Sequence, residues 1–341
     1  MDIKLAIKKV VSLNNLTEKE VYSVFDGIMT GKSTFAQIGA FITALRMKGE
    51  TVDEITGAAK VMIKKAVKIK TAFKSDCVVD TCGTGGSGTN VFNISTVSAF
   101  VLAACNVKVA KHGNRSASSK CGSADVLEEL GVNLNVSLKT VKKCIESINI
   151  GFLYAPLFHK AMKYAALPRK EIGIRTIFNV LGPLSNPALA KCQVLGVYDK
   201  DLTETLAKVL KKLGAKRAYV VHGMDSLDEV TITAKTKVSE LCGGKIRSYF
   251  ISPTDFGLKT ASMKSIKGGS VKMNAGIVRK ILNGKPGPQR DVVLMNSSVA
   301  LMAAGKVRSF KEGVKMSEQA LDTGAALEKL NALIKITNKK D

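Results

Sequence analysis

The spacing of the apolar side chains changes near residue 70. Before that point apolar residues recur every three or four positions, as over residues 21–28, which predicts short amphipathic helices. Thr17 precedes that stripe and Glu20 follows three residues later, which is the pattern of a capping box at a helix start. We therefore expect residues 1–70 to form a small N-terminal helical domain that packs against another part of the chain or dimerises.

After residue 75, short apolar runs alternate with longer segments of helical spacing. The runs are rich in β-branched residues and predict strands, whereas the segments between them have the length of helices. This alternation is typical of an α/β fold with a mostly parallel central sheet flanked by helices, here over residues 75–341. The expected strands are 77–80, 107–110, 218–221, 229–233 and 246–251.

The composition narrows the classes of protein and of ligand. With 45% hydrophobic residues the chain can bury sizeable cores, which excludes a disordered protein. Its 52 Lys+Arg against 28 Asp+Glu give a net charge of +24, spread evenly rather than gathered in a basic tail. An even excess favours anions in general, while the absence of Trp leaves few stacking platforms for nucleic-acid bases. Small polyanionic molecules are therefore the expected partners, ahead of nucleic acid.

Nothing in the sequence predicts a membrane or an oxidising compartment. The N-terminus carries charges every few residues, unlike the apolar centre of a signal peptide, and no segment reaches the roughly 18 apolar residues of a membrane span. The seven cysteines are scattered and form no CxxC pair, which is typical of free thiols in a reducing cytosol. We expect a cytoplasmic protein without a membrane partner.

The loop at 83–88 reads GTGGSG and carries the sharpest chemical signal. Four glycines in six residues let the backbone approach a ligand closely, and the following helix points the positive end of its dipole there. Asn93, Ser95 and Thr96 add side-chain donors where that helix begins. The loop matches neither a Walker A motif nor a dinucleotide fingerprint. We expect it to bind phosphate; the alternative is a flexible turn in which Asn93 and Ser95 only cap a helix.

Two further loops follow predicted strands and carry opposite charges. Lys111 and Arg115 belong to KHGNR at 111–115, which suits an anion beside the glycine loop, although a solvated basic turn has the same composition. Asp228 and Glu229 form the carboxylate pair of DSLDE, and such hard oxygen ligands are those that Mg²⁺ takes when it shares a substrate's phosphates. A polar turn with helix-capping acids is the alternative for this pair.

The order of these motifs resembles a known family. A further cationic segment, RKEIGIRTIFN at 169–179, suits either a carboxylate ligand or a surface ion pair. Together with GTGGSG and KHGNR it forms an ordered set that resembles the anthranilate phosphoribosyltransferases, over nearly the whole chain. KHGNR followed by GSAD is the most specific part of the match. The remaining motifs of the set are FNIST at 92–96, GSAD at 122–125, LGPL at 181–184 and LDE at 227–229.

The resemblance implies a fold, an activity and an assembly. The family joins a small helical domain, which dimerises, to a larger α/β domain, and helices from about 160–185 would pack back on the helical domain. Its members transfer the 5-phosphoribosyl group of phosphoribosyl pyrophosphate to the amine of anthranilate in tryptophan biosynthesis and release pyrophosphate. The implied cofactor is Mg²⁺, two ions per subunit, and the implied assembly is a homodimer.

The resemblance also implies site residues by position. Lys111 and Arg169 would be catalytic, with Arg169 orienting the anthranilate carboxylate. The implied metal ligands are Ser95, Asp228 and Glu229. The implied phosphoribosyl pyrophosphate-binding residues are Gly83, Gly85, Gly86, Ser87, Val91, Asn93, Ser95, Thr96, Lys111 and Ser123. The implied anthranilate-binding residues are Gly83, His112, Asn114, His159, Arg169 and Gly182.

Two positions depart from the family pattern. Ser87 stands where the family loop has an aspartate, and Val91 replaces a usual hydroxyl residue. Loss of a carboxylate beside the phosphates removes like-charge repulsion, so metal dependence is the property most affected. The net charge of +24 keeps open a nucleic-acid-binding relative without transferase activity, although paired carboxylates do not suit a DNA-binding face. A nucleoside phosphorylase of the same fold is a third alternative, which KHGNR fits poorly.

Overall fold

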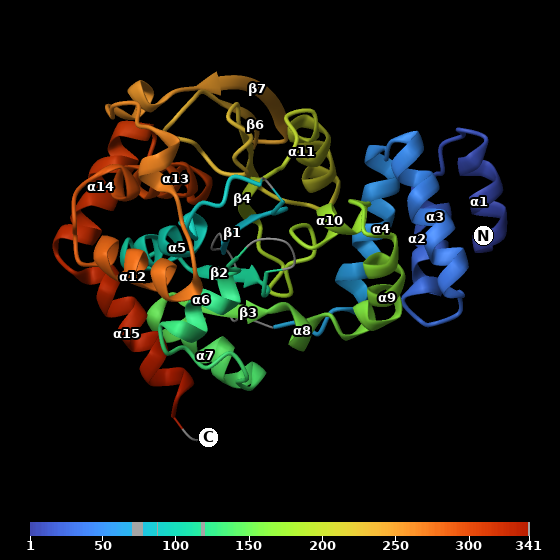
Figure 1. Ribbon diagram of the computed structural model, residues 1–341, viewed down its shortest axis with the longest axis horizontal. Coiled ribbons are helices and arrows are strands. Elements are labelled where there is room, and N and C mark those ends of the chain that lie inside the picture. The colour runs from blue at the N-terminus through green and yellow to red at the C-terminus, as the bar shows by residue number, and fades with distance from the viewer. Residues whose placement is uncertain (70–77, 87, 117–119, 340–341) are drawn as a thin grey trace.

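The computed structural model describes residues 1–69, 78–86, 88–116 and 120–339. Figure 1 shows two parts, a helical bundle around the N-terminus on the right and a sheet wrapped in helices on the left. Three helices of the bundle begin with capping boxes, at Thr17, Thr34 and Thr51, because each threonine is followed three residues later by Glu or Gln. The bundle helices are α1 Ile3–Val11, α2 Glu18–Ile28, α3 Phe35–Lys48 and α4 Val52–Lys65.

A later stretch of the chain returns to this bundle. Helix α9 (Lys163–Ile172) packs against α3, and the short helix α10 (Phe178–Leu181) packs against α4 (Figure 1). Phe178 of α10 lies with its ring centroid 5.5 Å from that of Phe25 in α2, inside the core of the bundle. The segment between Lys163 and Leu181 is therefore part of the helical half in space, although it follows the third strand in sequence.

The central sheet has seven strands in the order β3-β2-β1-β4-β5-β6-β7. The first five pair in parallel and the last two pair antiparallel, which confirms the predicted mostly parallel sheet. Because β1 lies between β2 and β4, the chain order reverses there, and ligands of such sheets bind beyond the carboxyl ends at that point. The strands are β1 Val79–Gly83, β2 Val109–Gly113, β3 Ile150–Tyr154, β4 Cys192–Gly196, β5 Arg217–Gly223, β6 Thr236–Cys242 and β7 Lys245–Ile251.

The strand predicted over residues 229–233 is wrong. The chain there is irregular, and the backbone of Val230 is satisfied by a side chain instead of a neighbouring strand. Asn296 accepts from the Val230 amide at 3.0 Å and donates to its carbonyl at 2.8 Å. The apolar side chains that suggested a strand are buried, but they hold a loop in place rather than extend the sheet.

Helices cover both faces of the sheet, and the apolar core divides accordingly. One cluster lies among α5, α13 and α15, whereas the other runs from the bundle through α11 to the opposite face. None of the helices in the described ranges has both the length and the apolar character needed to cross a bilayer. The remaining helices are α5 Ile94–Ala104, α6 Ser123–Glu129, α7 Leu138–Ile148, α8 Ala155–Phe158, α11 Leu202–Lys212, α12 Val271–Leu282, α13 Pro288–Ala304, α14 Phe310–Asp322 and α15 Ala325–Thr337, with 3₁₀ turns η1 Lys160–Met162, η2 Pro253–Phe256 and η3 Met263–Ile266.

Candidate active site

A carboxylate lies directly over the ends of the two central strands. Gly83 closes β1 and pairs in register with Gly196, which closes β4. A Cβ on Gly83 would lie 2.7 Å from Asp228 Oδ2, and one on Gly196 would lie 1.7 Å from the Asp228 carbonyl oxygen. Glycine at both positions is what allows this close approach. Asp228, from the loop after β5, therefore occupies the point of the sheet where the chain order reverses.

Both acids of the predicted pair are held by backbone amides. The Gly85 amide donates to Asp228 Oδ2 at 2.9 Å, and the Ser95 amide, at the start of α5, donates to Glu229 Oε1 at 3.1 Å. Burial and the neighbouring Asp228 raise the pKa of Glu229 to about 8. Near neutral pH Glu229 therefore mostly keeps its proton beside Asp228, and a cation bound there would favour its ionised form.

Lys111 brings positive charge to the same place from β2. Its buried Nζ donates to the Thr81 carbonyl and, at 3.2 Å, to Ser95 Oγ. Burial lowers the pKa of Lys111, while the nearby carboxyl groups of Asp80 and Glu229 act in the opposite direction. The ammonium is therefore fixed between β1 and the start of α5, and anion binding by the KHGNR motif stays a prediction.

The donor set fits magnesium shared with a substrate. Within the described ranges, no group of three or more His, Cys, Asp or Glu side chains is arranged to hold a metal by itself. Asp228, Glu229 and the Ser95 hydroxyl instead offer a few hard oxygen ligands, and Mg²⁺ usually completes such a set with water and phosphate oxygens. The observation that favours a cation at this point is the placement of both carboxyl groups against the glycine loop and the start of α5, each held by a backbone amide.

Two histidines implied for anthranilate lie side by side. The ring centroids of His112, in β2, and His159, after α8, are 5.0 Å apart. The backbone of Gly182 lies beside the His112 ring, and that of Ser185 beside the His159 ring. Burial lowers the pKa of His112 to about 3 and that of His159 to about 4, so both rings are neutral near pH 7. Their Nε2 atoms are buried without a hydrogen-bond partner in the described structure.

Arg169 is a partly buried cation in the last turn of α9. Its guanidinium lies over the Phe178 ring at 5.1 Å, and desolvation alone lowers its pKa. No carboxylate of the described chain pairs with it, so the surface ion pair considered as an alternative does not form there. The unpaired guanidinium of Arg169 suits a carboxylate ligand.

Asn114, which is also implied for anthranilate, is exposed, and its Oδ1 accepts a hydrogen bond from the Arg115 amide.

The Asn93 side chain hydrogen-bonds neighbouring segments of the chain and does not cap α5. Its Nδ2 donates to the Cys121 carbonyl at 3.2 Å, its Oδ1 accepts from Asn274 Nδ2 at 3.2 Å, and its side chain makes no cap hydrogen bond. The alternative in which Asn93 only caps the helix is therefore wrong. The neighbouring Thr96 hydroxyl is buried and without a hydrogen-bond partner among the described residues. Both side chains stand at the helix end that follows the glycine loop.

The other residues implied for phosphoribosyl pyrophosphate are spread around the glycine loop. Val91 forms an isolated antiparallel bridge with Lys267. Ser123 opens α6 and its hydroxyl donates to the Asn114 carbonyl at 3.4 Å. Gly86 accepts a hydrogen bond from Arg175. Ser87 lies outside the described residues.

Two charged residues of these loops make contacts within the fold. Arg115 makes two hydrogen bonds to the Glu128 carboxylate, at 2.8 and 2.9 Å, and one to Asp125 at 3.1 Å. In the described structure Arg115 is thus paired with acids of α6, and its contact with an anionic substrate stays a prediction. Asp225, two residues before Leu227, accepts from the Thr231 hydroxyl at 2.6 Å and so shapes the turn that presents Asp228.

Two residues near the site are not among those predicted from the sequence as site residues. Arg175 contacts the glycine loop from the connector between α9 and α10. Asn274, in α12, is buried and links Asn93 to the Gly269 amide, which it accepts at 2.8 Å. The adjacent glycines 268 and 269 were a usable signal, because a Cβ on Gly268 would lie 2.7 Å from the Phe92 amide.

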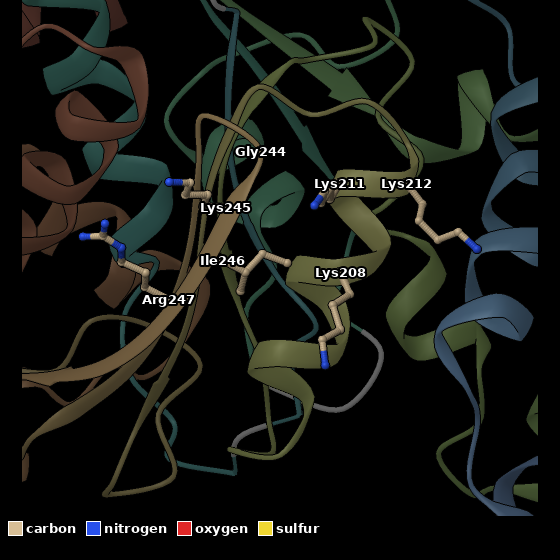
Figure 2. A pocket seen from close by; sticks show the side chains of 7 residues that line it. All are labelled: Lys208, Lys211, Lys212, Gly244, Lys245, Ile246 and Arg247. Atoms are coloured by element: carbon tan, nitrogen blue, oxygen red, sulfur yellow. The ribbon is translucent and has the colours of Figure 1, made fainter.

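A basic hollow of about 660 Å³ lies at the opposite edge of the sheet, between α11 and the β6–β7 turn (Figure 2). Arg217 at the start of β5 pairs with Cys242 at the end of β6, which places this turn at the amino ends of the parallel strands. Figure 2 shows Lys212 pointing away from Lys245 and Arg247, and Lys212 pairs with Glu18 at 3.0 Å. The side chains diverge, so this hollow lacks the converging donors of a phosphate site.

Family models match both halves of the chain. Residues 4–66 match the helical bundle domain of the glycosyl transferase family, and residues 75–327 match its a/b domain. Curated relatives agree over the full length. The anthranilate phosphoribosyltransferase of Acetivibrio thermocellus is 56% identical over 336 residues, covering 98% of this chain and 97% of the relative. That of Geotalea uraniireducens is 55% identical over 349 residues, covering 99% and 100%.

Solved structures are similar over the same length. The anthranilate phosphoribosyltransferase of Thermus thermophilus superposes with a TM-score of 0.92 at 38% identity, covering 98% of this chain and 99% of that one. The Saccharomyces cerevisiae enzyme in complex with phosphoribosyl pyrophosphate and Mg gives 0.90 at 29% identity, covering 98% and 97%. The matched family models, the relatives and the fold agree with the motifs of the site, and the chain belongs to the anthranilate phosphoribosyltransferase family.

Proposed function

We propose that this chain transfers the 5-phosphoribosyl group of phosphoribosyl pyrophosphate to the amino nitrogen of anthranilate, with release of pyrophosphate, in tryptophan biosynthesis. The observation that carries the proposal is the position of Asp228 over Gly83 and Gly196. At this position the glycine loop, the buried Lys111 and the carboxylate pair lie together. Relatives from yeast have been solved with phosphoribosyl pyrophosphate and Mg, and with 4-fluoroanthranilate.

The main task of such a site is to stabilise the departing pyrophosphate. Displacement at the anomeric carbon develops positive charge on the ribose and negative charge on the leaving group. Lys111 is proposed to neutralise that negative charge, and the loop amides with the positive end of α5 add to it. Because Lys111 is buried, its charge acts through a medium of low polarity and is worth more than in water.

Asp228, Glu229 and Ser95 are proposed to hold Mg²⁺, with two ions per subunit. When bound, Mg²⁺ supplies Lewis-acid stabilisation of the phosphate oxygens. Its binding requires the Glu229 carboxyl to lose its proton, since burial and Asp228 otherwise hold the pKa near 8. The Gly85 and Ser95 amides already orient one oxygen of each carboxylate.

The nucleophile needs positioning more than deprotonation, because an aromatic amine is neutral at physiological pH. Arg169 is proposed to bind the anthranilate carboxylate through its planar guanidinium. The neutral rings of His112 and His159 would line the path of the substrate, with Asn114 and Gly182 beside them. The remaining phosphoribosyl pyrophosphate-binding residues are proposed to be Gly83, Gly85, Gly86, Ser87, Val91, Asn93, Thr96 and Ser123.

We propose in addition a cytoplasmic homodimer that associates through a helical domain of residues 1–70, with residues 75–341 as the substrate-binding domain. Several large apolar side chains of the bundle are exposed, and Met47 is 82% exposed. Burying such side chains against a second copy would remove them from water. The exposed set in the bundle includes Leu5, Val11, Leu13, Phe35 and Met47.

The fluorescence of anthranilate provides the test. Anthranilate consumption is followed with phosphoribosyl pyrophosphate and Mg²⁺ together, and with each left out in turn. We expect consumption only in the complete mixture. Absence of turnover there, combined with a salt-dependent gel shift with DNA, would support the nucleic-acid-binding alternative instead.

A further inference from the structure

Arg175 belongs to one half of the molecule and contacts the other. It lies on the connector between α9, which packs on the bundle helix α3, and α10, which packs on α4. Its Nη2 donates to the carbonyl of Gly86 in the glycine loop at 2.6 Å. This contact spans 89 residues of sequence and brings a cation to the loop proposed to receive the pyrophosphate.

The glycine loop needs such a contact to keep one conformation. Gly85 and Gly86 have φ angles of +68° and +78°, and glycine backbones lose more conformational freedom on ordering than other residues. A hydrogen bond from a charged guanidinium to a carbonyl is stronger than one between neutral groups. Arg175 thereby offsets part of the entropic cost of ordering the loop before substrate arrives.

Tyr198 is a second contact of the Arg175 guanidinium. The guanidinium lies 4.5 Å from the centroid of the Tyr198 ring, a cation–π contact. The Tyr198 amide donates to Thr84 Oγ1 at 3.1 Å, and the Thr84 amide donates to the Gly196 carbonyl at 2.9 Å. The residue that stacks on Arg175 thus also holds Thr84, the second residue of the loop, which is bonded to the end of β4.

The end of the bundle helix α3 also lies near Tyr198. Burial raises the pKa of Tyr198, and the charges of Arg46 and Glu50, at and just after the end of α3, act on it. Arg175 and Tyr198 therefore lie where the bundle, the α9–α10 connector and the glycine loop meet.

We propose that Arg175 is a positioning residue that holds the glycine loop, through Gly86, in the conformation that binds the pyrophosphate of phosphoribosyl pyrophosphate. The inference rests on the proposed function, since that function supplies the ligand of the loop. Arg175 acts through Gly86 and Tyr198 and is not required to touch the substrate. Six positions earlier, Arg169 is proposed to bind the anthranilate carboxylate, so one short segment serves both substrates.

Steady-state kinetics with each substrate varied in turn test this role. The variants are Arg175→Ala, Arg175→Lys, which keeps the charge without the planar stack, and Lys170→Ala, a matched loss of an exposed cation on the same segment. We expect Arg175→Ala to raise KM for phosphoribosyl pyrophosphate on the order of tenfold and to change KM for anthranilate much less. Arg175→Lys should fall between this variant and wild type, and Lys170→Ala should match wild type.

The outcomes separate this inference from the proposed function. Wild type that consumes no anthranilate contradicts the proposed function itself. Active wild type with an Arg175→Ala variant of unchanged KM, or with equal rises in both KM values, overturns the role of Arg175. If Arg175→Ala does not fold, Tyr198→Leu replaces it, because this change removes the stacked ring and leaves the guanidinium. A selective rise in KM for phosphoribosyl pyrophosphate is again expected. Unchanged KM values in Tyr198→Leu overturn the proposal.

Discussion

Gly83→Ala probes the approach of Asp228 to β1. The φ angle of Gly83 is not positive, so alanine fits the backbone, but its Cβ would lie 2.7 Å from Asp228 Oδ2. Ordinary contact begins near 3.4 Å, and the carboxylate therefore has to retreat by about 0.7 Å. That movement breaks the 2.9 Å hydrogen bond from the Gly85 amide. The substitution thus displaces one proposed metal ligand without adding or removing a charge.

The size of the effect follows from the hydrogen bond that is lost. A hydrogen bond from an amide to a charged group contributes about 1.5–3 kcal/mol. A loss of about 2 kcal/mol corresponds to roughly 30-fold weaker binding of the metal-bound substrate. We therefore expect Gly83→Ala to need on the order of 30-fold more Mg²⁺ or phosphoribosyl pyrophosphate for half-maximal rate.

The assay is an initial-rate titration of Mg²⁺ at fixed phosphoribosyl pyrophosphate, with thermal unfolding of the same samples. Gly276→Ala is the matched control, because Gly276 lies inside α12 and a Cβ there meets nothing within 4 Å. The control should keep the wild-type titration and gain up to about 1 kcal/mol of stability. A Gly83→Ala titration that superimposes on that of wild type would refute the placement of Asp228 at the metal.

Three further results are expected. Arg169→Ala should raise KM for anthranilate far more than KM for phosphoribosyl pyrophosphate, and equal rises would refute its role. Because burial lowers the pKa of His112 to about 3 and that of His159 to about 4, each ring resists protonation and the folded state loses stability as pH falls below about 6.5. Other groups, such as Glu229, change stability over the same range, so the prediction concerns the difference between two proteins. Between pH 8 and pH 5 the free energy of unfolding of wild type, measured by chemical denaturation, should change unfavourably by about 2 kcal/mol more than that of His112→Gln; equal changes in the two proteins contradict the assignment. Asn274→Ala removes the side chain that donates to Asn93. It should lower the free energy of unfolding by about 1–3 kcal/mol and raise KM for phosphoribosyl pyrophosphate. A wild-type free energy of unfolding together with a wild-type KM would show that Asn274 does not position Asn93.

The sequence predicts those parts of the site that follow strands. The glycine loop follows β1, Lys111 lies near the end of β2 and Asp228 belongs to the loop after β5, and parallel strands bring their carboxyl ends to one edge. Their chemistry is also local, since glycines, a lysine and paired acids are legible without knowledge of the fold. The convergence of Asp228 on Gly196 could not be predicted, because the expected strands did not include β4, which Gly196 closes, or the order of the strands.

The errors and omissions arise where the deciding partner is distant. The segment at 229–233 has the residue types of a strand, but Asn296, which satisfies Val230, lies 66 residues away. Arg115 carries the charge of a ligand-binding residue, yet acids of the following helix neutralise it. Arg175 belongs to the cationic segment at 169–179, but its contact could not be predicted, because its partner Gly86 lies 89 residues earlier in the chain. Such pairings are set by packing and are not encoded in local spacing.

The most direct test of the account is a crystal structure of this chain with phosphoribosyl pyrophosphate and Mn²⁺ in place of Mg²⁺, read by the anomalous signal of the metal. We predict a metal peak within coordination distance of the Asp228 and Glu229 carboxylates, with the pyrophosphate against the Gly85–Gly86 turn and the Lys111 ammonium. A metal and pyrophosphate bound elsewhere, such as the basic hollow beside α11, with the carboxylate pair empty, would contradict the central claim.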